Sequence, residues 1–432
     1  MNSKKFKIFI TIFVIAVSAV FAGTPSFAPV ASAKVTSLNG LYIAGVDGIS
    51  GLSINPASLA YLKGRALELS VFGRLGQQDY VDKRGLLYRS YRDDDIGVTA
   101  GAFWNLTENF TVGVDYNNSV QSKVDWPFAI FVQGDSSSGI FTFDHYNNYT
   151  ITSINPSAAL NLGSFSIGLS VNVLNIKHTM GFYQGNPNWE SMEAGIAAYQ
   201  VKVDEDAWAF GGTLGFQGYL TPKLKIGAFL RSTISASLEG DSESRLFADL
   251  DSTEAKTSVT SDFELPWTFG LGALYDISDN LKLNVDATYS LWGSTQEIQK
   301  YKYGNSFWSS RFSEVDSLSG YTGANFPLKY QNAFSVGFGL EYDPHADVVV
   351  RFGYKFSQTR NTDETYSYLY PGVDQHWLSL GIGFWFESFY VDMAIAYGTS
   401  AERTVSQKEN KFFAGKYSGD IYIPSINIKY QF

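Results

Sequence analysis

The chain has 432 residues, 40 glycines, no cysteine and 16% aromatic residues, a composition that favours a β-rich fold without disulfide bonds. Its formal net charge is −10, and the 42 acidic residues face 29 basic ones once the three lysines of residues 1–33 are set aside from the total of 32. This excess of negative charge argues against nucleic acid as a partner, because nucleic-acid binding depends on neutralising phosphates.

The first 33 residues have the layout of a secretory signal peptide. Lys4, Lys5 and Lys7 precede an apolar run at 8–22 that is too short to span a membrane. Small residues follow, and three cleavage positions stay open: after Ala22, Ala28 or Ala33. No later stretch reaches the roughly 18 consecutive apolar residues of a membrane helix. If the protein lies in a membrane, we therefore expect it to do so as a β-barrel.

Residues 34–64 lack the regular alternation of the rest of the chain and contain small residues throughout. The Asn55-Pro56-Ala57 turn predicts a short helix from Pro56 to about Leu62, because asparagine caps helices and proline suits their first position. We interpret 34–64 as a plug, or hatch, with Asn55, Pro56 and Ala57 as its gate.

Period-two alternation of apolar and polar residues recurs from residue 65 to the end. Within 281–291 the odd positions are all apolar, whereas the even positions are Lys282, Asn284, Asp286, Thr288 and Ser290. The pattern predicts fourteen strands, at 66–75, 95–105, 108–120, 148–162, 165–178, 206–220, 224–238, 262–276, 280–293, 330–343, 347–360, 375–387, 389–400 and 421–432.

The connections decide between a soluble sandwich and a membrane barrel, since both would show this alternation. Six short turns, such as 105–109 and 162–164, alternate with seven long polar loops, at about 75–94, 121–147, 179–205, 239–260, 295–329, 361–374 and 401–419. Short connections at one end and long ones at the other are typical of outer-membrane barrels, with periplasmic turns and extracellular loops. We predict that 65–432 form an all-β transmembrane antiparallel barrel in the outer membrane of a Gram-negative bacterium.

The inward parity of the predicted strands is rich in glycine, with Gly101, Gly215 and Gly353 as examples. Glycine weakens a strand and often marks the close approach of another segment. We therefore expect the lumen to be filled, and 34–64 is the obvious segment to fill it.

At this point the chain resembles the FadL/TodX-type outer-membrane transporters of long-chain fatty acids and aromatic hydrocarbons. "GVDGISGLSINPASLAYL" is similar to that family's hatch, and "SINPSAALNLGSFSIGLSVNV", "DAWAFGGTLGFQGYLTPKLKIGAFLRSTISASLEGD" and "ELPWTFGLGALYDISDNLKLNVDATYSLWGS" are similar to its barrel segments. The resemblance implies a hatch-plugged barrel of fourteen strands that releases its ligand through a wall opening at a kink of the third strand. The family's Pro-Phe-Gly-Leu-like stretch at that kink is here "DYNNSV", at 115–120, and Gln375 replaces a usual arginine.

Three aromatic residues are candidates for binding an apolar ligand. Phe229, Trp292 and Trp377 face inward by parity, and pockets for hydrophobic molecules are lined by aromatic side chains with few polar groups. Ordinary packing in the lumen would account for them equally well. A second set of aromatics faces outward, where girdles at the membrane interface are expected: Tyr289, Tyr354, Tyr397, Tyr422 and Phe432.

A set of charged residues also faces inward by parity. These residues could form a gating or carboxylate-binding network, but we favour structural pairing with one another and with the hatch, because unpaired charges in a confined lumen are costly. The predicted lumen charge network comprises Arg231, Lys282, Asp286, Arg351 and Asp392, with Asp115 and Glu341 on the same parity.

No pattern of catalytic, metal or cofactor-binding residues stands out. The four histidines have no metal-ligand spacing, and the chain lacks a cysteine nucleophile. The acidic loop at 239–254 could bind Ca²⁺ or bridge lipopolysaccharide, but it lacks the spacing of a calcium loop, and a solvated loop is favoured. We predict no enzyme activity, no metal and no cofactor.

The favoured function is passive import of a hydrophobic small molecule, with lateral exit as a further step implied by the resemblance. The alternative is a barrel that serves as a surface-anchoring or secretion-associated platform for protein partners. We expect a monomer in contact with the lipid bilayer and lipopolysaccharide. The last strand should pair with 67–71 to close the ring, and Phe432 resembles the C-terminal aromatic signal of the barrel-assembly machinery.

Overall fold

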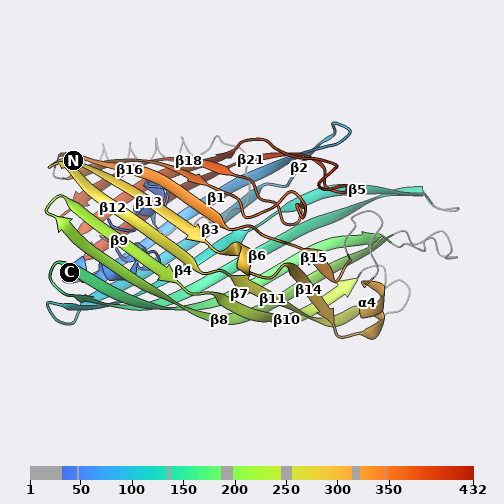
Figure 1. Cartoon of the computed structure of the whole chain (residues 1–432), viewed down its shortest axis with the longest axis horizontal. Helices are drawn as coiled ribbons and strands as arrows, with labels where there is room; N and C mark the ends of the chain where they lie inside the picture. The colour runs from blue at the N-terminus through green and yellow to red at the C-terminus, as the bar shows by residue number, and fades with distance from the viewer. Residues whose placement is uncertain are drawn as a thin grey trace.

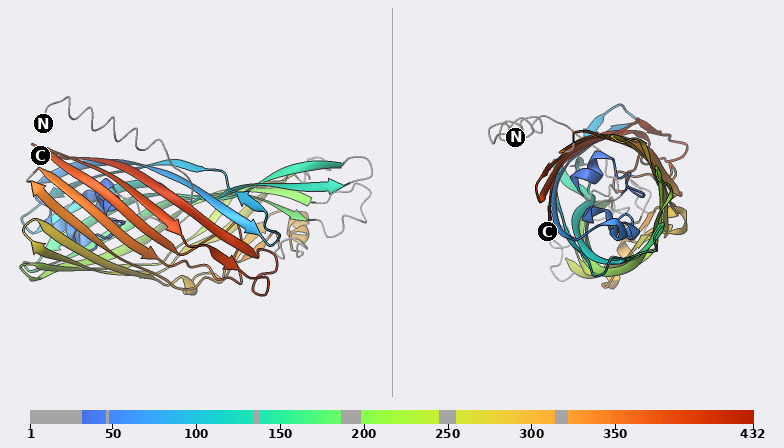
Figure 2. Two further views of the ribbon diagram at one scale, coloured as in Figure 1. Left: turned by 90° about the horizontal axis from the view of Figure 1, so that it is seen from above. Right: turned by 90° about the vertical axis from the view of Figure 1, so that its left-hand side faces the viewer.

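The computed structural model describes residues 32–45, 48–133, 138–185, 198–244, 255–313, 322–345 and 347–432. Its strands form one antiparallel sheet that closes into a tall barrel, with the N-terminal segment inside (Figures 1 and 2). The predicted signal peptide, residues 1–33, lies outside the described residues except for its last two positions.

The described residues contain fourteen wall strands, as predicted, and every wall strand pairs with a neighbour on each side. Two of them are interrupted: β9 is followed by β10, and β11 by β12 after Pro266, which has no amide hydrogen to donate. In chain order the wall consists of β1 Arg65–Asp82, β3 Asp93–Asn105, β4 Phe110–Ser122, β6 Ser138–Asn161, β7 Phe165–Gly185, β8 Ala198–Thr221, β9 Leu224–Arg231 with β10 Ile234–Ser244, β11 Lys256–Leu265 with β12 Thr268–Ser278, β13 Leu281–Ser290, β16 Ala333–His345, β17 Val348–Ser357, β18 Gln375–Phe386, β19 Phe389–Ser400 and β21 Gly415–Gln431.

The barrel has a short-turn end and a long-loop end, as the connection lengths predict. Short turns such as 106–109 and 387–388 join neighbouring strands at one end, where β1 begins and β21 stops. At the other end β6, β7 and β8 run well beyond their predicted bounds and project past the other strands (Figure 1). In the extension of β8 the alternation continues but reverses its parity, since the buried Val201 and Val203 occupy odd positions and the outward Phe210 an even one.

The loops at the long-loop end also contain secondary structure that the sequence did not indicate. A hydrophobic cluster that includes Met180, Tyr301 and Trp308 packs beneath them and holds them in place. The added elements are β2 Leu87–Arg89, β5 Asp125–Gln133, η4 Trp292–Ser294, β14 Ile298–Tyr303, α4 Ser306–Arg311, β15 Asn325–Pro327 and β20 Arg403–Val405.

The outer face of the wall is apolar. Ile96 is 79% exposed, Leu271 67% and Phe210 65%. Large apolar side chains exposed over a continuous band mark a surface covered by lipid rather than by water. No helix among the described residues is long and apolar enough to cross a membrane.

The ring closes between the first and last strands, in the region predicted from the sequence. Leu67 pairs with Tyr430 and Val71 with Ile426. The Phe432 amide donates to the Arg65 carbonyl at 3.0 Å, and the Arg65 guanidinium lies 5.1 Å from the Phe432 ring. Closure matters because an unpaired backbone group in lipid costs several kcal/mol.

The third wall strand, β4, is not broken. It pairs continuously with β3 from Thr111 to Asn118, and with β6 over the same stretch, and its first irregularity falls between Val120 and Ser122. The wall opening that the family resemblance implies at this strand is therefore not found in the described residues.

The N-terminal segment occupies the lumen at the short-turn end (Figure 2). It consists of α2 Ala33–Ser37, η1 Ile49–Gly51 and η2 Pro56–Tyr61 with the residues between them. The predicted helix after Asn55 is confirmed as a 3₁₀-helix, and Asn55 Oδ1 accepts from the Ala57 amide at 3.2 Å. We call the described residues of 32–64 the plug.

Inward glycines give the plug room to approach the wall. A β-carbon at Gly215 would lie 2.1 Å from Asn55 Oδ1, and one at Gly168 would lie 2.4 Å from the Ala57 nitrogen. A β-carbon at Gly227 would meet the Ile43 carbonyl at 2.4 Å. These positions bear out the expectation that the glycine-rich parity marks a filled lumen.

Candidate functional site

A cavity of about 430 Å³ lies inside the barrel next to the plug. Leu41, Ile43 and Ile54 of the plug form one boundary. Residues 358–374, the connection between β17 and β18, contribute to the side towards the long-loop end, and we call this connection the lid. Phe229, Trp292 and Trp377, the three aromatics singled out from the sequence, all line this cavity.

Each of the three aromatics is held by its surroundings. Phe229 is 8% exposed and lies against Gly270, where a β-carbon would come within 2.1 Å of its ring. Trp377 is 3% exposed, and its carbonyl accepts from Asn39 Nδ2 of the plug at 3.3 Å. Neither side chain can move far without disturbing the wall or the plug.

Trp292 connects the wall to the lid. It begins the short helix η4, just beyond the end of β13. The Arg360 guanidinium of the lid lies 4.0 Å from the Trp292 ring and 4.6 Å from the Tyr330 ring. Such cation–π contacts contribute about 0.5–2 kcal/mol.

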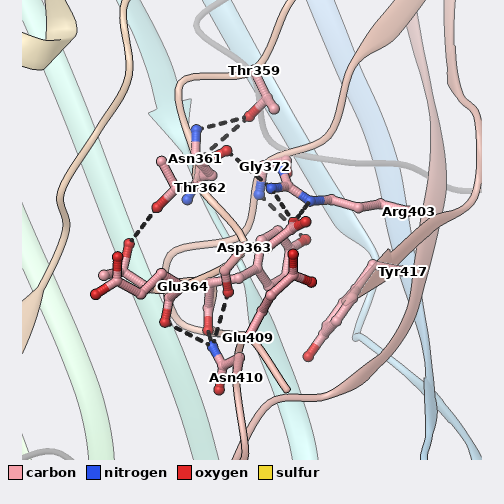
Figure 3. A network of polar contacts seen from close by, with 12 residues as sticks. Thr359, Asn361, Thr362, Asp363, Glu364, Gly372, Arg403, Glu409, Asn410 and Tyr417 are labelled. Carbon is pink, nitrogen blue, oxygen red and sulfur yellow. Dashed lines mark hydrogen bonds and ion pairs between the residues drawn. The ribbon is translucent and has the colours of Figure 1, made fainter. Parts of the chain in front are cut away.

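A polar network fastens the lid to the loop before β21 (Figure 3). Arg403 Nε donates to Asp363 Oδ1 at 2.8 Å, and its two terminal nitrogens donate to the carbonyls of Gly372 and Asn361 at 2.9 and 3.0 Å. Asn410 Nδ2 donates to the Tyr366 carbonyl at 2.8 Å. One arginine thus binds both ends of the lid.

The lid also reaches β5 and the wall strand β6 on the far side of the lumen. Trp126 Nε1 of β5 donates to the Tyr368 carbonyl at 3.0 Å, and Asn147 Nδ2 of β6 donates to the Leu369 carbonyl at 2.8 Å. Tyr366 and Leu369 are buried at 1% and 6% exposure. The lid therefore spans the lumen and is anchored at both sides.

The predicted gate residues lie where the plug meets β7 and β8. Asn55 Nδ2 donates to the Ile43 carbonyl at 2.9 Å and to the Phe216 carbonyl at 3.1 Å. Ser166 Oγ donates to the Ala57 carbonyl at 3.0 Å. Pro56 lies against Gly168 and Gly215. Asn55 thus both shapes the plug and binds it to the wall.

Four of the predicted charged residues separate into a wall cluster and contacts with the plug. Arg351 Nε donates to Glu341 Oε2 at 2.9 Å, and Arg351 Nη1 donates to Asp392 Oδ1 at 2.6 Å. Lys34 of the plug lies 3.4 Å from Glu341 Oε2. Asp286 Oδ2 accepts from the Ile43 amide of the plug at 2.8 Å.

Lys282 is the direct cross-strand partner of Glu341, but its ammonium group pairs with a different carboxylate. Its side chain is 40% exposed at the short-turn end and lies 3.9 Å from Asp343. The ion pair of Lys282 is therefore more exposed than those of the wall cluster. A pair this exposed contributes at most about 1 kcal/mol.

Arg231 belongs to a belt of hydrogen bonds that crosses five neighbouring wall strands. Asp115 Oδ2 accepts from Asn155 Nδ2 at 2.9 Å, Asn155 Oδ1 accepts from Asn172 Nδ2 at 2.8 Å, and Asn172 Oδ1 accepts from Thr213 Oγ1 at 2.8 Å. Arg231 Nε donates to Thr213 Oγ1 at 3.4 Å, and Arg231 Nη2 donates to the Ser53 carbonyl of the plug. We call these side chains the polar belt.

Sequence reasoning did not identify Arg403 and Asp363, or Asn172 and Thr213 of the belt. Arg403 and Asp363 lie in two loops without periodicity, so no pattern links them. Asn172 and Thr213 do share the inward parity, but short polar residues on that face gave no distinguishing signal.

A buried polar pair, His178 and Glu205, lies nearer the long-loop end of the barrel. His178 Nδ1 lies 2.7 Å from Glu205 Oε1, which also accepts from Ser261 Oγ at 2.6 Å, and His178 Nε2 lies 2.9 Å from Asn147 Oδ1. Since Ser261 contacts the carboxylate and not the histidine, the group is not arranged as a catalytic triad. The described residues contain no cluster of three or more potential metal ligands.

Comparisons with known proteins agree with this architecture. The family model described as "Outer membrane protein transport protein (OMPP1/FadL/TodX)" matches residues 148–432, which is more than half of the chain. No curated protein sequence matches significantly.

Solved structures of similar fold cover nearly the whole chain. A Pseudomonas aeruginosa FadL homologue superposes with a TM-score of 0.74 at 16% identity, covering 95% of this chain and 100% of its own. The Pseudomonas putida toluene transporter TodX gives 0.71 at 16% identity, with 93% and 98% covered. The Ralstonia pickettii toluene transporter TbuX gives 0.67 at 17% identity, with 95% and 99% covered. The plugged barrel and the family match together show that this chain belongs to the OMPP1/FadL/TodX family of transport proteins, which are not enzymes, and lies in the outer membrane of a Gram-negative bacterium.

Proposed function

We propose that this protein is a passive importer of a hydrophobic small molecule through the plugged barrel. The observation that carries the proposal is the 430 Å³ cavity that Phe229, Trp292 and Trp377 line between the plug and the lid. A volume of this size falls within the range of small-molecule sites, which are concave and largely apolar. The relatives whose solved structures have this fold include toluene transporters.

Two barriers stand between the cavity and the two sides of the membrane. On the long-loop side the lid is held by Arg403 and by the contact of Arg360 with Trp292. On the short-turn side the plug is held at Asn55 and by Ser166. Import then requires the lid to admit the ligand and the Asn55–Ala57 region to rearrange and release it. The neutral hydrogen bonds of the plug contribute about 0.5–1.5 kcal/mol each, and the charged Arg403–Asp363 bond of the lid about 1.5–3 kcal/mol.

The exit that this proposal favours runs along the barrel axis past the plug. The uninterrupted pairing of β4 argues against lateral release at the third strand. Pairing of β6 with β7 does skip Asn155 and Pro156, since proline has no amide hydrogen, and pairing of β1 with β21 skips Gly73 and Arg74 opposite Pro424. The β6–β7 interruption, which we call the seam, is one place that lateral release could use.

The seam can be tested with a cross-link, because the chain has no native cysteine. Ile154 and Val173 are directly paired beside the seam, and paired antiparallel positions lie within the Cα distance that a disulfide needs. Oxidised I154C/V173C protein is expected to import at the wild-type rate. Loss of import that a reductant restores would instead assign the exit to this seam.

Import itself is tested by uptake of labelled long-chain fatty acid or toluene into cells or proteoliposomes. Deletion of 34–64 and Trp292→Ala should each change uptake, the first by removing the plug and the second by removing a cavity wall. Trp104→Ala is the matched control, because Trp104 is 56% exposed on the outer face and does not line the cavity. If neither variant changed uptake, the importer proposal would be wrong.

No observation favours the alternative of a platform for protein partners. Contact with lipopolysaccharide, recognition of Phe432 by the assembly machinery, the monomeric state and the signal peptide stay predictions from the sequence.

A further inference from the structure

The cavity of the proposed importer has two chemically different walls. On one side Ile151, Leu174 and Ile234 present aliphatic side chains from β6, β7 and β10, and these residues belong to one hydrophobic cluster. On the other side four neighbouring strands, β12, β13, β16 and β17, present a group of small hydroxyl side chains at the level of the cavity, together with the charged residues Asp286 and Lys355. This hydroxyl wall consists of Thr268, Thr288, Ser290, Ser335 and Ser357.

The register of the strands brings these hydroxyls together in pairs. Thr268 is the direct cross-strand partner of Ser290, and their oxygens lie 3.0 Å apart. Thr288 is the partner of Ser335, and their oxygens lie 2.7 Å apart. Each pair of hydroxyls has two donors and four acceptor positions, and their mutual bond uses one of each. Each pair therefore offers three acceptor positions for its one remaining donor.

Two further acceptor atoms belong to residues that line the same cavity, and they add to the excess of acceptors over donors. Asp286 is 2% exposed, and its Oδ1 has no hydrogen-bond partner among the described residues, although Oδ2 accepts from Ile43. Asn117 Oδ1 is likewise buried without a partner in the described part of the chain. Buried acceptors without partners are costly, so a ligand that donates hydrogen bonds to them would be favoured over one that cannot.

We propose that the imported compound is hydrophobic but carries hydroxyl groups, as phenols and aliphatic alcohols do, and that the hydroxyl wall of this cavity selects it over a bare hydrocarbon. The apolar part lies against the aliphatic wall, and the hydroxyl group donates to the opposite wall. This inference rests on the proposed function, because it names the class of compound that the same cavity takes. A hydrocarbon of equal size would cover the acceptors of the hydroxyl wall and satisfy none of them.

The test is equilibrium binding of three labelled probes of the same ring size to purified full-length protein: toluene, p-cresol and p-toluate. Binding is compared between wild type and Thr288→Val, which replaces a hydroxyl by a methyl of similar size. We expect the variant to weaken p-cresol binding about 5- to 10-fold, the equivalent of one net hydrogen bond, and to leave toluene binding unchanged or tighter. The wild-type-to-variant ratio of affinities is taken for each probe, which cancels the difference in hydrophobicity between the probes.

Two further variants make the result specific to the hydroxyl wall. Ser335→Ala removes the other member of the same pair and should act in the same direction. Thr99→Val is the control, since Thr99 is 4% exposed and faces the lumen but does not line the cavity. It should change the affinity of no probe.

The possible failures are distinguishable. If wild type binds toluene and p-cresol and Thr288→Val weakens both equally or neither, the inference is overturned while the importer proposal stands. If p-toluate binds most tightly and Thr288→Val changes nothing, the cationic side chains that also line the cavity, Arg231, Lys355 and Arg360, decide selection. This result again overturns the inference. If wild type binds none of the probes, the proposed function and the inference fall together.

Discussion

Two arginines, Arg351 and Arg231, both face inward by sequence parity. Their surroundings in the structure are quite different. Arg351 is 1% exposed, and all its described contacts are with wall residues: Glu341, Tyr390 and Asp392. Arg231 lines the cavity, and it bonds to a hydroxyl of the wall and to a backbone carbonyl of the plug. One arginine has two carboxylates, while the other has neutral partners.

The wall around Arg351 is built for that contact. Arg351 lies on β17 and Asp392 on β19, with β18 between them. The inward positions of β18 near this bridge are Gly381 and Gly383, and a β-carbon at Gly383 would lie 2.3 Å from the Tyr390 hydroxyl and 2.6 Å from Asp392 Oδ1. Glycine on the middle strand thus allows side chains of β17 and β19 to meet above it. The cluster is a permanent part of the wall.

The surroundings of Arg231 differ because one of its partners belongs to a separate segment. The Ser53 carbonyl lies in the plug, two residues before Asn55. If the plug moves, the bond between Arg231 and the Ser53 carbonyl breaks. The Arg351–Asp392 bond joins two wall strands and can stay intact. The comparison therefore separates charges that stabilise the barrel from a charge that stabilises the position of the plug.

The largest effect is expected for Arg351→Met. Removal of the guanidinium leaves Asp392 buried without its counter-ion and Glu341 with Lys34 of the plug alone, and breaking a buried ion pair from one side costs about 3–5 kcal/mol. Urea unfolding of the refolded barrel in lipid vesicles measures this. Lys282→Met is the matched control, because the exposed Lys282 pair should contribute no more than about 1 kcal/mol. Equal unfolding midpoints for the two variants would show that the cluster does not stabilise the wall.

The two arginines also mark how far sequence reasoning could go. Parity together with the connection lengths predicted the wall, and parity predicted the closure of the last strand against 67–71 and the inward direction of Arg231, Arg351 and Asp392. Parity could not show which arginine binds the wall and which binds the plug, because their partners depend on the cross-strand register and on the path of the plug. Both are set by long-range contacts that leave no local period in the sequence.

The lid shows a second limit. Arg403 and Asp363 are 40 positions apart in loops of ordinary polar composition, and only the folded barrel brings them within 2.8 Å. Polar side chains of this kind are usually solvated, so nothing in their spacing distinguishes an anchor from a surface charge. The aromatics Phe229, Trp292 and Trp377 were easier to single out, because large apolar side chains on an inward, polar parity are unusual.

A second prediction concerns the seat of the plug. Gly215→Ala places a methyl group 2.1 Å from Asn55 Oδ1, and overpacking of this kind costs about 1–3 kcal/mol. The cost falls on the seated plug, so its displaced state should become about 5- to 150-fold more populated. Ion conductance in planar bilayers should rise accordingly. Gly212→Ala, where the nearest atom is 3.7 Å from the new β-carbon, serves as the control on the same strand. A Gly215→Ala channel that conducts like the control would mean that the plug adapts without moving.

The smallest of the three effects is expected for Arg231→Met. The substitution removes the charged hydrogen bond to the Ser53 carbonyl, and such bonds contribute about 1.5–3 kcal/mol. Part of this is regained, because the carbonyl lines a cavity next to other polar groups, so we expect about a tenfold increase in local opening of the plug. Hydrogen–deuterium exchange of the backbone amides in 48–56 measures that opening directly.

Barrel stability in urea should stay close to wild type, because Thr213 keeps its bond to Asn172. Arg231→Lys retains the charge with a single short donor group. Its rate of exchange in 48–56 should fall between those of wild type and Arg231→Met. If instead Arg231→Met lowered the urea midpoint as much as Arg351→Met and left the exchange of 48–56 unchanged, the two arginines would have the same role, and the distinction between wall and plug charges would have to be given up.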